Sequence, residues 1–309
     1  MPVVLFHSGS NNAERWRAAL AEAMPELEFR VSSDPGDKGE IEYALVWKPP
    51  AGLLASLPRL KVIASLGAGV DHILADPTLP DLPVVRLVDP HMVAAMSEFV
   101  VTQVLRLHRQ DLVYAAQQRR GEWRERWQPN ADERRVGILG LGTMGTDAAL
   151  KLKALGFDVA GWSRRPKDVP GVRSYAGESG LAGMLAQTQI LVCLLPLTAD
   201  TDGILNARLF ARLPRGAMLL NAGRGAHLVE EDLVPALDSG QLSAAVLDVF
   251  RQEPLPSSHP FWRDERIVVT PHIAATTNPR TAAFIVADTF RRARDGQPLL
   301  NVVDRAARY

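Results

Sequence analysis

Short apolar runs alternate with helix-like segments over the first hundred residues. The runs Val3–Phe6, Tyr43–Trp47 and Val62–Leu66 have the length and composition of buried strands, and Ala13–Ala23 has the apolar spacing of an amphipathic helix. Strands that alternate with helices are typical of a parallel sheet covered by helices on both faces. The pattern therefore predicts an α/β domain in this part of the chain.

A second series of apolar runs begins at Arg135. Six runs follow, most of them rich in Val, Ile and Leu: VGILG, DVAGW, ILVCLLP, AMLLNA, AAVLDVF and RIVVTP. Helical segments separate most of these runs, at Asp147–Leu155, Gly180–Ala186, Asn206–Arg212 and Glu230–Asp238. Strands this apolar are required where both faces of a sheet are buried, so we expect a second parallel sheet.

Three further segments lie outside these two series. We expect one helix from Met96 to about Gln118, and another from Asn278 to Arg294 that returns to the first domain. Residues 119–135, RRGEWRERWQPNADERR, carry many charges and two tryptophans but show no period. We interpret them as a projecting arm or, equally, as a solvated surface loop.

Composition removes several classes of function. The 309 residues include 35 Lys plus Arg and 35 Asp plus Glu, so no basic surplus is present to neutralise nucleic-acid phosphates. The single cysteine, Cys193, excludes an internal disulfide framework, and the histidines lack metal-ligand spacing, so we expect no metal site. The N-terminus lacks the basic start of a signal peptide, and no apolar stretch approaches 18 residues. We therefore expect a two-domain cytoplasmic protein without a membrane segment.

A glycine-rich turn follows the first strand of the second series. The run VGIL leads directly into Gly140, Gly142 and Gly145, in the pattern G-x-G-x-x-G, and a helix follows. In that context the first glycine allows a tight turn, the second lets the backbone approach a pyrophosphate, and the third lets the helix pack on the strand. Amides at the helix start can then bind the phosphates. The motif predicts a dinucleotide site that also includes Thr143 and Met144.

The second strand of such a unit indicates which dinucleotide binds. It usually ends in a carboxylate that binds the ribose 2′-hydroxyl of NAD. Here the strand Asp158–Trp162 is followed by Ser163, Arg164 and Arg165 instead. Arginine accommodates the 2′-phosphate of NADP through charge-assisted hydrogen bonds, so we predict NADP(H) as the preferred cofactor and NAD(H) as one that can be accepted. The alternative is that both arginines are solvated turn residues.

Arg224, Glu253 and His272 each follow the end of a strand in the second series. Ligands of open α/β sheets bind outside the carboxyl ends of the strands, so these side chains could share one site. Arginine binds a carboxylate through two hydrogen bonds, and a protonated histidine can give a proton to the alkoxide that hydride transfer produces. Glu253 would orient His272 and stabilise its charged form. The trio fits the reduction of a 2-oxo acid.

These residues also have plainer interpretations. Arg224 could lie in a surface turn, Glu253 could pair with a surface arginine, and His272 could be structural. Asp248 lies in a buried run, where it either contacts the nicotinamide side of the cofactor or is a hydrogen-bonded core carboxylate. We interpret Cys193 as a buried small hydrophobe. His7, His91, His108, His227 and His259 are interpreted as structural or surface residues.

Together these motifs resemble the D-isomer-specific 2-hydroxyacid dehydrogenase family over essentially the whole chain. The segments that carry the resemblance are Gly67–Asp71, Gly140–Gly145, Asn221–Gly225, Asp248–Leu255 and Pro271–Ala274. Within the family, Leu45–Pro50, Trp162–Arg164 and Val303–Ala306 resemble a bacterial subgroup that uses NADPH. Lys48 departs from that subgroup, in which we expect histidine, and this puts the substrate preference in doubt.

The resemblance implies a fold and a set of site residues. The fold would be α/β, with two doubly wound parallel-sheet domains and a cleft between them. A flavodoxin-like substrate domain would comprise residues 1–98 and 276–309, and a Rossmann dinucleotide-binding domain would comprise residues 99–275. Arg224, Glu253 and His272 would be catalytic. The other implied contacts are Leu195, Pro196, Ala222 and Asp248 for the cofactor, and Trp47, Ala68, Gly69, Val70 and Arg224 for the substrate.

The implied reaction is the NADPH-dependent reduction of small 2-oxo acids, glyoxylate and hydroxypyruvate first. We expect a homodimer in which the segment Gln118–Arg134 and the helix before it reach over the partner, because interfaces favour aromatic anchors such as Trp123 and Trp127 and two-fold pairing is common. Two alternatives stay open. The protein could be a dinucleotide-sensing, corepressor-like binding protein, or a dehydrogenase for another 2-oxo acid such as 2-ketogluconate.

Overall fold

The computed structural model describes residues 1–9 and 12–307, and the chain divides into two compact units. The first unit comprises Met1–Met92 and Thr277–Tyr309, and the second comprises Val93–Thr276. The division expected from the sequence falls six residues later than the first of these boundaries and one residue earlier than the second. Each unit holds its own parallel sheet.

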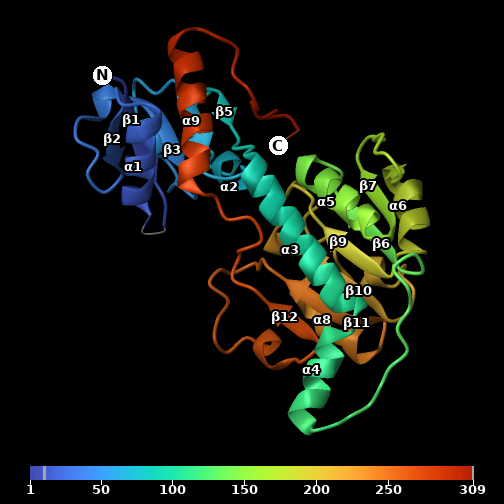
Figure 1. Cartoon of the computed structure of the whole chain (residues 1–309). Helices are drawn as coiled ribbons and strands as arrows, with labels where there is room; N and C mark the ends of the chain where they lie inside the picture. The colour runs from blue at the N-terminus through green and yellow to red at the C-terminus, as the bar shows by residue number, and fades with distance from the viewer. Residues whose placement is uncertain (10–11, 308–309) are drawn as a thin grey trace. The chain divides into compact units, whose positions relative to one another are not determined.

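The first unit is built on a sheet with the strand order β2-β1-β3-β4-β5 (Figure 1). Its strands are β1 (Val3–His7), β2 (Glu28–Val31), β3 (Ile41–Val46), β4 (Val62–Ser65) and β5 (Val84–Val85). All neighbours are parallel, and the order 2-1-3-4-5 is that of flavodoxin-like folds. The helices of this unit are α1 (Ala13–Ala23), α2 (Asp71–Leu74) and α9 (Pro279–Arg294).

The C-terminal helix belongs to the first unit, as the sequence predicts. Helix α9 packs against α1 on one face of the sheet (Figure 1). Phe290 of α9 stacks on Tyr43 of β3, with ring centroids 4.5 Å apart, and both side chains are fully buried. Burying a large aromatic side chain contributes roughly 1.5–3 kcal/mol, so this contact helps to hold the end of the chain on the N-terminal sheet.

The second unit is built on a sheet with the order β12-β11-β10-β9-β6-β7-β8. Its strands are β6 (Arg135–Leu139), β7 (Asp158–Ser163), β8 (Arg173–Ala176), β9 (Ile190–Cys193), β10 (Ala217–Asn221), β11 (Leu242–Leu247) and β12 (Ile267–Val269). Its helices are α3 (Pro90–His108, which begins just before the unit), α4 (Asp111–Arg120), α5 (Thr143–Ala154), α6 (Gly177–Leu185), α7 (Ala207–Phe210) and α8 (Glu230–Asp238). Numbered within the unit, the strands follow the Rossmann order 3-2-1-4-5-6 with one more edge strand.

Alternate residues of the central strands enter two different apolar clusters. Leu191 of β9 and Leu219 of β10 belong to one cluster, whereas Val192 and Leu220 belong to the other. Because successive side chains of a strand point to opposite faces, the two clusters cover the two faces of the sheet. This explains why the strand sequences are apolar without a break, and it confirms the predicted doubly wound α/β class.

The prediction of a single helix from Met96 to Gln118 is wrong. The segment forms two helices, because α3 ends at His108 and Gln110 takes a left-handed conformation with φ of 60° before α4 begins. No glycine or proline marks this break. The short strands β2, β5 and β8 were also absent from the expected elements. Among the described residues, no helix is both long and apolar enough to cross a membrane.

Candidate active site

The turn between β6 and α5 is shaped by three glycines. Gly140 has a left-handed φ of 104°, and a Cβ placed there would lie 2.8 Å from the carbonyl oxygen of Leu194. A Cβ on Gly145 would lie 1.8 Å from the carbonyl oxygen of Gly140. In contrast, a Cβ on the exposed Gly142, which precedes the first turn of α5, would meet no atom within 4 Å. The turn therefore leaves open space at a helix N-terminus, as a bound pyrophosphate requires.

The other residues predicted to bind the cofactor lie around this turn. Thr143 and Met144 form the start of α5, the first exposed and the second half-buried. The backbone of Leu195 borders Gly140. Ala222 is buried after β10, and its N–H donates to the carbonyl of Cys193 at the end of β9. Pro196 is exposed, so the segment after β9 offers backbone and side-chain surface beside the glycine turn.

The turn after β7 carries Ser163, Arg164 and Arg165. The N–H of Gly140 donates to the carbonyl of Trp162 at 2.8 Å, which fixes this turn next to the glycine turn. Both arginines are exposed, and the hydroxyl of Ser163 donates to the carbonyl of Arg165 at 2.6 Å. The turn presents two guanidinium groups where an NAD-binding unit would present a carboxylate.

The register of three neighbouring strands aligns the loops that carry Arg224, Glu253 and His272. Asn221 of β10 pairs with Leu247 of β11, and Leu247 pairs with Val269 of β12. The three loops therefore leave the same edge of the sheet from adjacent positions. Ligands of open α/β sheets usually bind at this position, outside the carboxyl ends of the strands.

His272 and Glu253 form a direct pair. Nδ1 of His272 lies 3.0 and 3.1 Å from the two carboxylate oxygens of Glu253. The Phe250 N–H donates to the same carboxylate at 3.2 Å, and both side chains of the pair are partly buried. Because Nδ1 faces a carboxylate, the proton sits on that atom and Nε2 becomes the nitrogen that can exchange a proton with a ligand.

Asp248 shapes the loop that presents His272. Its buried carboxylate accepts hydrogen bonds from the Thr270 hydroxyl at 2.6 Å and from the N–H groups of Ile273 and Ala274 at 2.9 Å each. Its carbonyl accepts the N–H of His272, which has a left-handed φ of 56°. These bonds fit the interpretation of Asp248 as a hydrogen-bonded core carboxylate. A contact between Asp248 and the cofactor stays a prediction.

Two buried side chains hold the Arg224 loop. The Asn221 side chain donates to the carbonyl of Arg224 at 3.0 Å and accepts the N–H of Gly223 at 3.2 Å. Nδ1 of His227 accepts the N–H of Arg224 at 3.0 Å. Gly225 lies so close to Phe250 that an added Cβ would be 1.9 Å from that residue's carbonyl carbon. The Arg224 loop is thus packed directly against the loop that leads to Glu253.

His227, which the sequence indicates only as a structural or surface residue, holds the Arg224 loop, and its spacing in the sequence carries no signal of that contact. It is fully buried, and its partners are brought to it by the fold. Cys193, in contrast, is the buried small hydrophobe that the sequence predicts, and burial raises the pKa of its thiol to about 12. Within the part of the chain that the structure describes, no three His, Cys, Asp or Glu residues are grouped so as to hold a metal ion.

The residues predicted to bind substrate in the first unit also lie together. The loop after β4 contains Ala68, Gly69 and Val70, and the hydroxyl of Ser65 donates to the carbonyl of Gly69 at 3.2 Å. The Trp47 ring packs on this loop, because a Cβ on its Gly67 would lie 2.8 Å from that ring. The ring also contacts His72, with centroids 4.3 Å apart.

A Rossmann sheet with a glycine cradle, joined to an arginine and a Glu–His pair at neighbouring strand ends, defines a nucleotide-dependent oxidoreductase. Comparisons with known proteins give the same class of protein. Residues 101–274 match the family model described as the NAD binding domain of D-isomer specific 2-hydroxyacid dehydrogenases. The chain belongs to the D-isomer-specific 2-hydroxyacid dehydrogenase family, whose members are NAD(P)-dependent oxidoreductases.

Particular relatives cover nearly the whole chain. Glyoxylate/hydroxypyruvate reductase A of Serratia proteamaculans is 46% identical over 97% of this chain and 98% of its own length. A D-isomer specific 2-hydroxyacid dehydrogenase from Xanthobacter autotrophicus, solved with NADPH and MES, is 45% identical with a TM-score of 0.96, over 100% of this chain and 99% of its own. An NADPH-dependent glyoxylate/hydroxypyruvate reductase from Sinorhizobium meliloti, solved with NADP and sulfate, is 44% identical with a TM-score of 0.93 at the same coverage.

Proposed function

We propose that the protein is an NADPH-dependent reductase of small 2-oxo acids, with glyoxylate and hydroxypyruvate as its substrates. The observation that carries this proposal is the strand-end arrangement of Arg224 and the His272–Glu253 pair beside the glycine cradle. The names of the relatives from Serratia and Sinorhizobium support the choice of substrate. Their similarity over nearly the full chain favours this reading over a dehydrogenase of a larger 2-oxo acid.

Each residue of the trio has its own part in the reaction. The Arg224 guanidinium binds the substrate carboxylate through two hydrogen bonds and polarises the adjacent carbonyl. Bound NADPH supplies the hydride that adds to C2. Protonated His272 gives its Nε2 proton to the carbonyl oxygen, so that a 2-hydroxy acid and NADP⁺ are formed. Glu253 holds Nδ1–H, which keeps the ring oriented and stabilises its positive charge.

The turn after β7 selects the cofactor. Arg164 and Arg165 are exposed beside the glycine turn, where the adenosine ribose of a dinucleotide lies in Rossmann units. Their guanidinium groups attract the 2′-phosphate of NADPH, and the turn bears no carboxylate to bind the 2′-hydroxyl of NADH. Three structural relatives solved with NADPH or NADP support this preference.

In the first unit, Trp47 and the loop of Ala68, Gly69 and Val70 contact the substrate. The loop offers backbone N–H groups to a carboxylate, and the indole ring of Trp47 packs against its Gly67.

A panel of 2-oxo acids tests the proposed reaction. Glyoxylate, hydroxypyruvate, pyruvate and 2-ketogluconate are each assayed with NADPH and with NADH by the disappearance of the reduced nicotinamide. We expect the highest kcat/KM with NADPH and one of the first two acids. Dinucleotide binding without turnover on any acid would favour a dinucleotide-sensing binding protein instead.

We also propose a homodimer in which residues 121–130, the central part of the expected arm, cover the partner. The arm has no helix or strand, and its Trp123 and Trp127 side chains are 103% and 76% exposed. The arm is nevertheless tied to its own unit, because Gln110 donates to the carbonyl of Trp127 at 2.7 Å and Arg126 donates to Gln110 at 2.8 Å. Large aromatic residues that are held in place yet exposed are typical anchors of interfaces.

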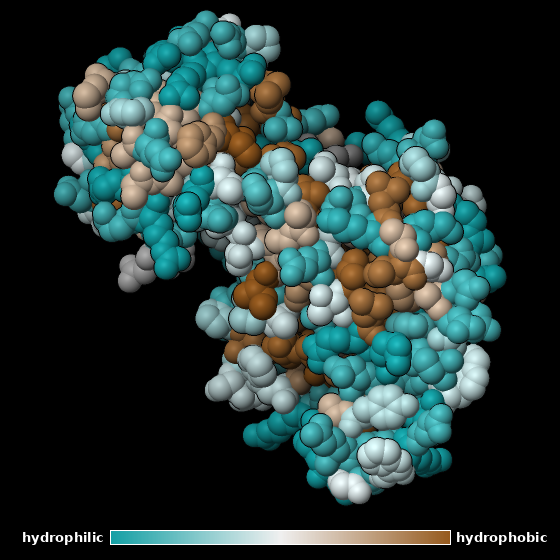
Figure 2. Space-filling view, viewed as in Figure 1, coloured by the Kyte–Doolittle hydropathy of each residue, from teal (hydrophilic) through white to brown (hydrophobic). Residues whose placement is uncertain are grey.

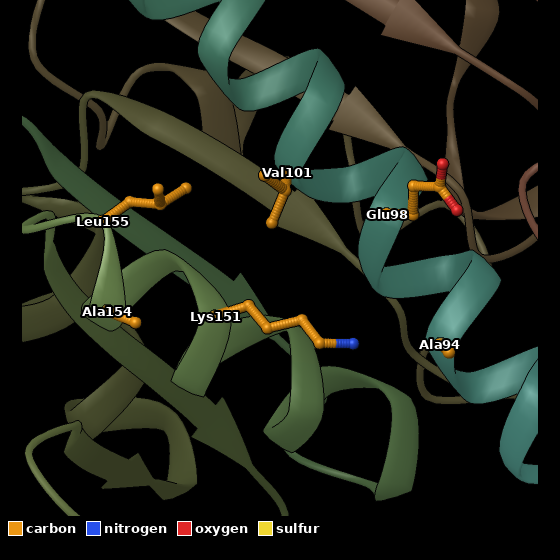
Figure 3. Close-up of a pocket in the computed structure, with 6 residues that line it drawn as sticks. All are labelled: Ala94, Glu98, Val101, Lys151, Ala154 and Leu155. Carbon is orange, nitrogen blue, oxygen red and sulfur yellow. The ribbon is translucent and has the colours of Figure 1, made fainter.

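A groove on the same unit supports this assembly. It lies between α3 and α5, has a volume of about 510 Å³ and is mostly apolar. Its lining residues are Ala94, Glu98, Val101, Lys151, Ala154 and Leu155. Figure 3 shows Val101 and Leu155 extending into it from opposite sides, and Figure 2 shows apolar residues gathered on this face of the unit. Among the lining residues, Leu155 is 46% exposed, so the groove offers an apolar surface to a partner.

Sedimentation or light scattering tests the dimer. We expect a dimer at micromolar concentration, and replacement of Trp123 and Trp127 together by Ser should shift it toward monomer. Trp262→Ser is the matched control, since this tryptophan is also exposed on the second unit but lies outside the arm. A monomeric unmodified protein would contradict the proposal.

We further propose that the protein acts in the cytoplasm and binds no nucleic acid. The single cysteine suits a compartment that keeps thiols reduced, and the balanced charge suits a protein without a polyanionic partner. Cell fractionation and a filter-binding assay with duplex DNA at low salt test the two statements.

A further inference from the structure

The buried imidazole of His227 has no part in the reaction described above. The residue ends the short helical turn Gly225–His227, directly after Arg224, and its exposed fraction is 0%. Nδ1 accepts the N–H of Arg224 at 3.0 Å, and Nε2 lies 3.3 Å from the carbonyl oxygen of Pro196. The Sγ atom of Cys193 lies 3.7 Å from Nδ1. His227 therefore joins the Arg224 loop to the segment that follows β9.

These contacts fix the protonation of the ring. A backbone N–H can only donate, so Nδ1 must present its lone pair to Arg224. A backbone carbonyl can only accept, so Nε2 must carry the proton that faces Pro196. His227 is thus the neutral Nε2–H tautomer, because a proton on Nδ1 would point at the N–H of Arg224.

The close packing around the ring leaves it little freedom. A Cβ on Gly223 would lie 2.9 Å from Nδ1 of His227 and 3.2 Å from the carbonyl oxygen of Leu195. On the other side of Arg224, the side chain of Asn221 donates to its carbonyl at 3.0 Å. The backbone of Arg224 is therefore held at its N–H by His227 and at its carbonyl by Asn221. Because both backbone groups of Arg224 are held, the direction in which its side chain extends from the backbone is fixed.

We propose that His227 is a positioning residue for the reaction. It locks the backbone of Arg224 to the Leu195–Pro196 segment, so that the group that binds the substrate carboxylate keeps a constant position beside the cofactor segment. A misplacement of a substrate-binding group by about 1 Å can lower the reaction rate roughly a hundredfold, so a fixed position of Arg224 favours the reaction. This inference rests on the proposed role of Arg224 as the carboxylate-binding residue.

Two substitutions separate the two contacts of the ring. In His227→Asn, the side-chain oxygen lies near the place of Nδ1 and can still accept the N–H of Arg224. In His227→Gln, the longer amide can still donate toward Pro196 but leaves no acceptor at the place of Nδ1. The matched control is Thr188→Val, which removes another buried side-chain hydrogen bond of the second unit, from the Thr188 hydroxyl to the carbonyl of Met184 at 2.8 Å.

We expect His227→Gln to raise the KM for glyoxylate and the inhibition constant of oxamate about tenfold, or about 1.4 kcal/mol, with the Kd for NADPH unchanged. His227→Asn should keep both values within about threefold of the unmodified protein. Thr188→Val should lower Tm only. In an Arg224→Lys background, His227→Gln should add no further loss, because the position of the original guanidinium no longer matters. An unchanged KM in His227→Gln, or an equal loss in His227→Asn, would overturn the proposal.

A spectroscopic measurement does not depend on the reaction. The ¹⁵N shifts of the His227 ring in the unmodified protein should show a protonated Nε2 and an unprotonated Nδ1 near neutral pH. The opposite tautomer or a doubly protonated ring would contradict the proposed lock. If this tautomer is found but no 2-oxo acid is reduced, the proposed function is contradicted, whereas the hydrogen bond between His227 and the N–H of Arg224 is supported. If glyoxylate is reduced with the wrong tautomer, the role of His227 alone fails.

Discussion

The loops of Arg224 and His272 and the turn of Arg164 and Arg165 all follow strands of the same sheet, yet they are held very differently. The two loops are fixed by buried polar side chains, with Asn221 and His227 around Arg224 and Asp248 around His272. The turn is exposed, and the hydroxyl of Ser163 donates to the carbonyl of Arg165 across it.

This difference matches two kinds of task. Groups that act on bond-making atoms need a fixed position, because catalysis falls steeply when the geometry loosens. Recognition of a phosphate by flexible cationic side chains needs charge more than geometry, since Coulomb attraction changes slowly with distance. We therefore expect large losses from changes in the fixed loops and smaller losses in the exposed turn.

Arg224→Ala should have a large effect. It removes two charge-assisted hydrogen bonds to the substrate carboxylate, each worth roughly 1.5–3 kcal/mol, so kcat/KM for glyoxylate should fall by about 10²–10⁴-fold. Both KM and kcat should change, because the guanidinium acts in the ground state and in the transition state. Steady-state kinetics checks this, with the exposed Arg212→Ala as the control. Near-normal turnover would remove Arg224 from the site.

Replacement of Arg164 and Arg165 together by Ala should have a smaller effect. One lost contact to the 2′-phosphate already corresponds to about a tenfold change, so the preference for NADPH over NADH should fall by at least that factor. The loss should come from weaker NADPH binding, with NADH kinetics little changed. Lys153→Ala, an exposed lysine of α5, controls for the loss of positive charge. Equal kcat/KM for both cofactors in the unmodified protein would mean that the arginines are only solvated turn residues.

The smallest predicted effect concerns stability at the base of the arm. Burial, together with the nearby cations Arg134 and Arg109, lowers the pKa of His108 in the folded protein. The unfolded chain then takes up this proton first, so stability is lost as pH falls through the ordinary histidine value of about 6.5 and toward the lower folded value.

Thermal unfolding at about pH 7.5 and about pH 5.5 checks this prediction. His108→Gln should lose less Tm on acidification than the unmodified protein does, by a few degrees at most. His91→Gln, at an exposed histidine, is the control. An identical acid sensitivity in His108→Gln would show that another group is responsible.

The fixed loops were only partly predictable from the sequence. The glycine turn could be predicted because its three glycines stand between an apolar run and a helical segment, and Arg224 and His272 because each follows such a run. The residues that hold the loops gave no such signal. His227 meets Cys193 and Pro196, more than thirty positions earlier, only because β9 and β10 pair in register.

Two local features could not be predicted from the sequence, because no glycine, proline or apolar run lies within them. The break between α3 and α4 falls at Gln110, which takes a left-handed conformation without being glycine or asparagine. The edge strand β8, with the sequence RSYA, is partly exposed and lacks the apolar run of the central strands. In both places tertiary packing decides the backbone conformation more than local propensity does.

The measurement that tests the central claim most directly is the kinetics of His272→Ala with glyoxylate, together with its affinity for NADPH. We predict that kcat falls by roughly 10²–10⁴-fold, as expected for the loss of a positioned proton donor. The Kd for NADPH, measured by nicotinamide fluorescence, should stay that of the unmodified protein. A kcat close to normal would contradict the assignment of His272 as the proton donor and, with it, the account of the three strand-end loops as the active site.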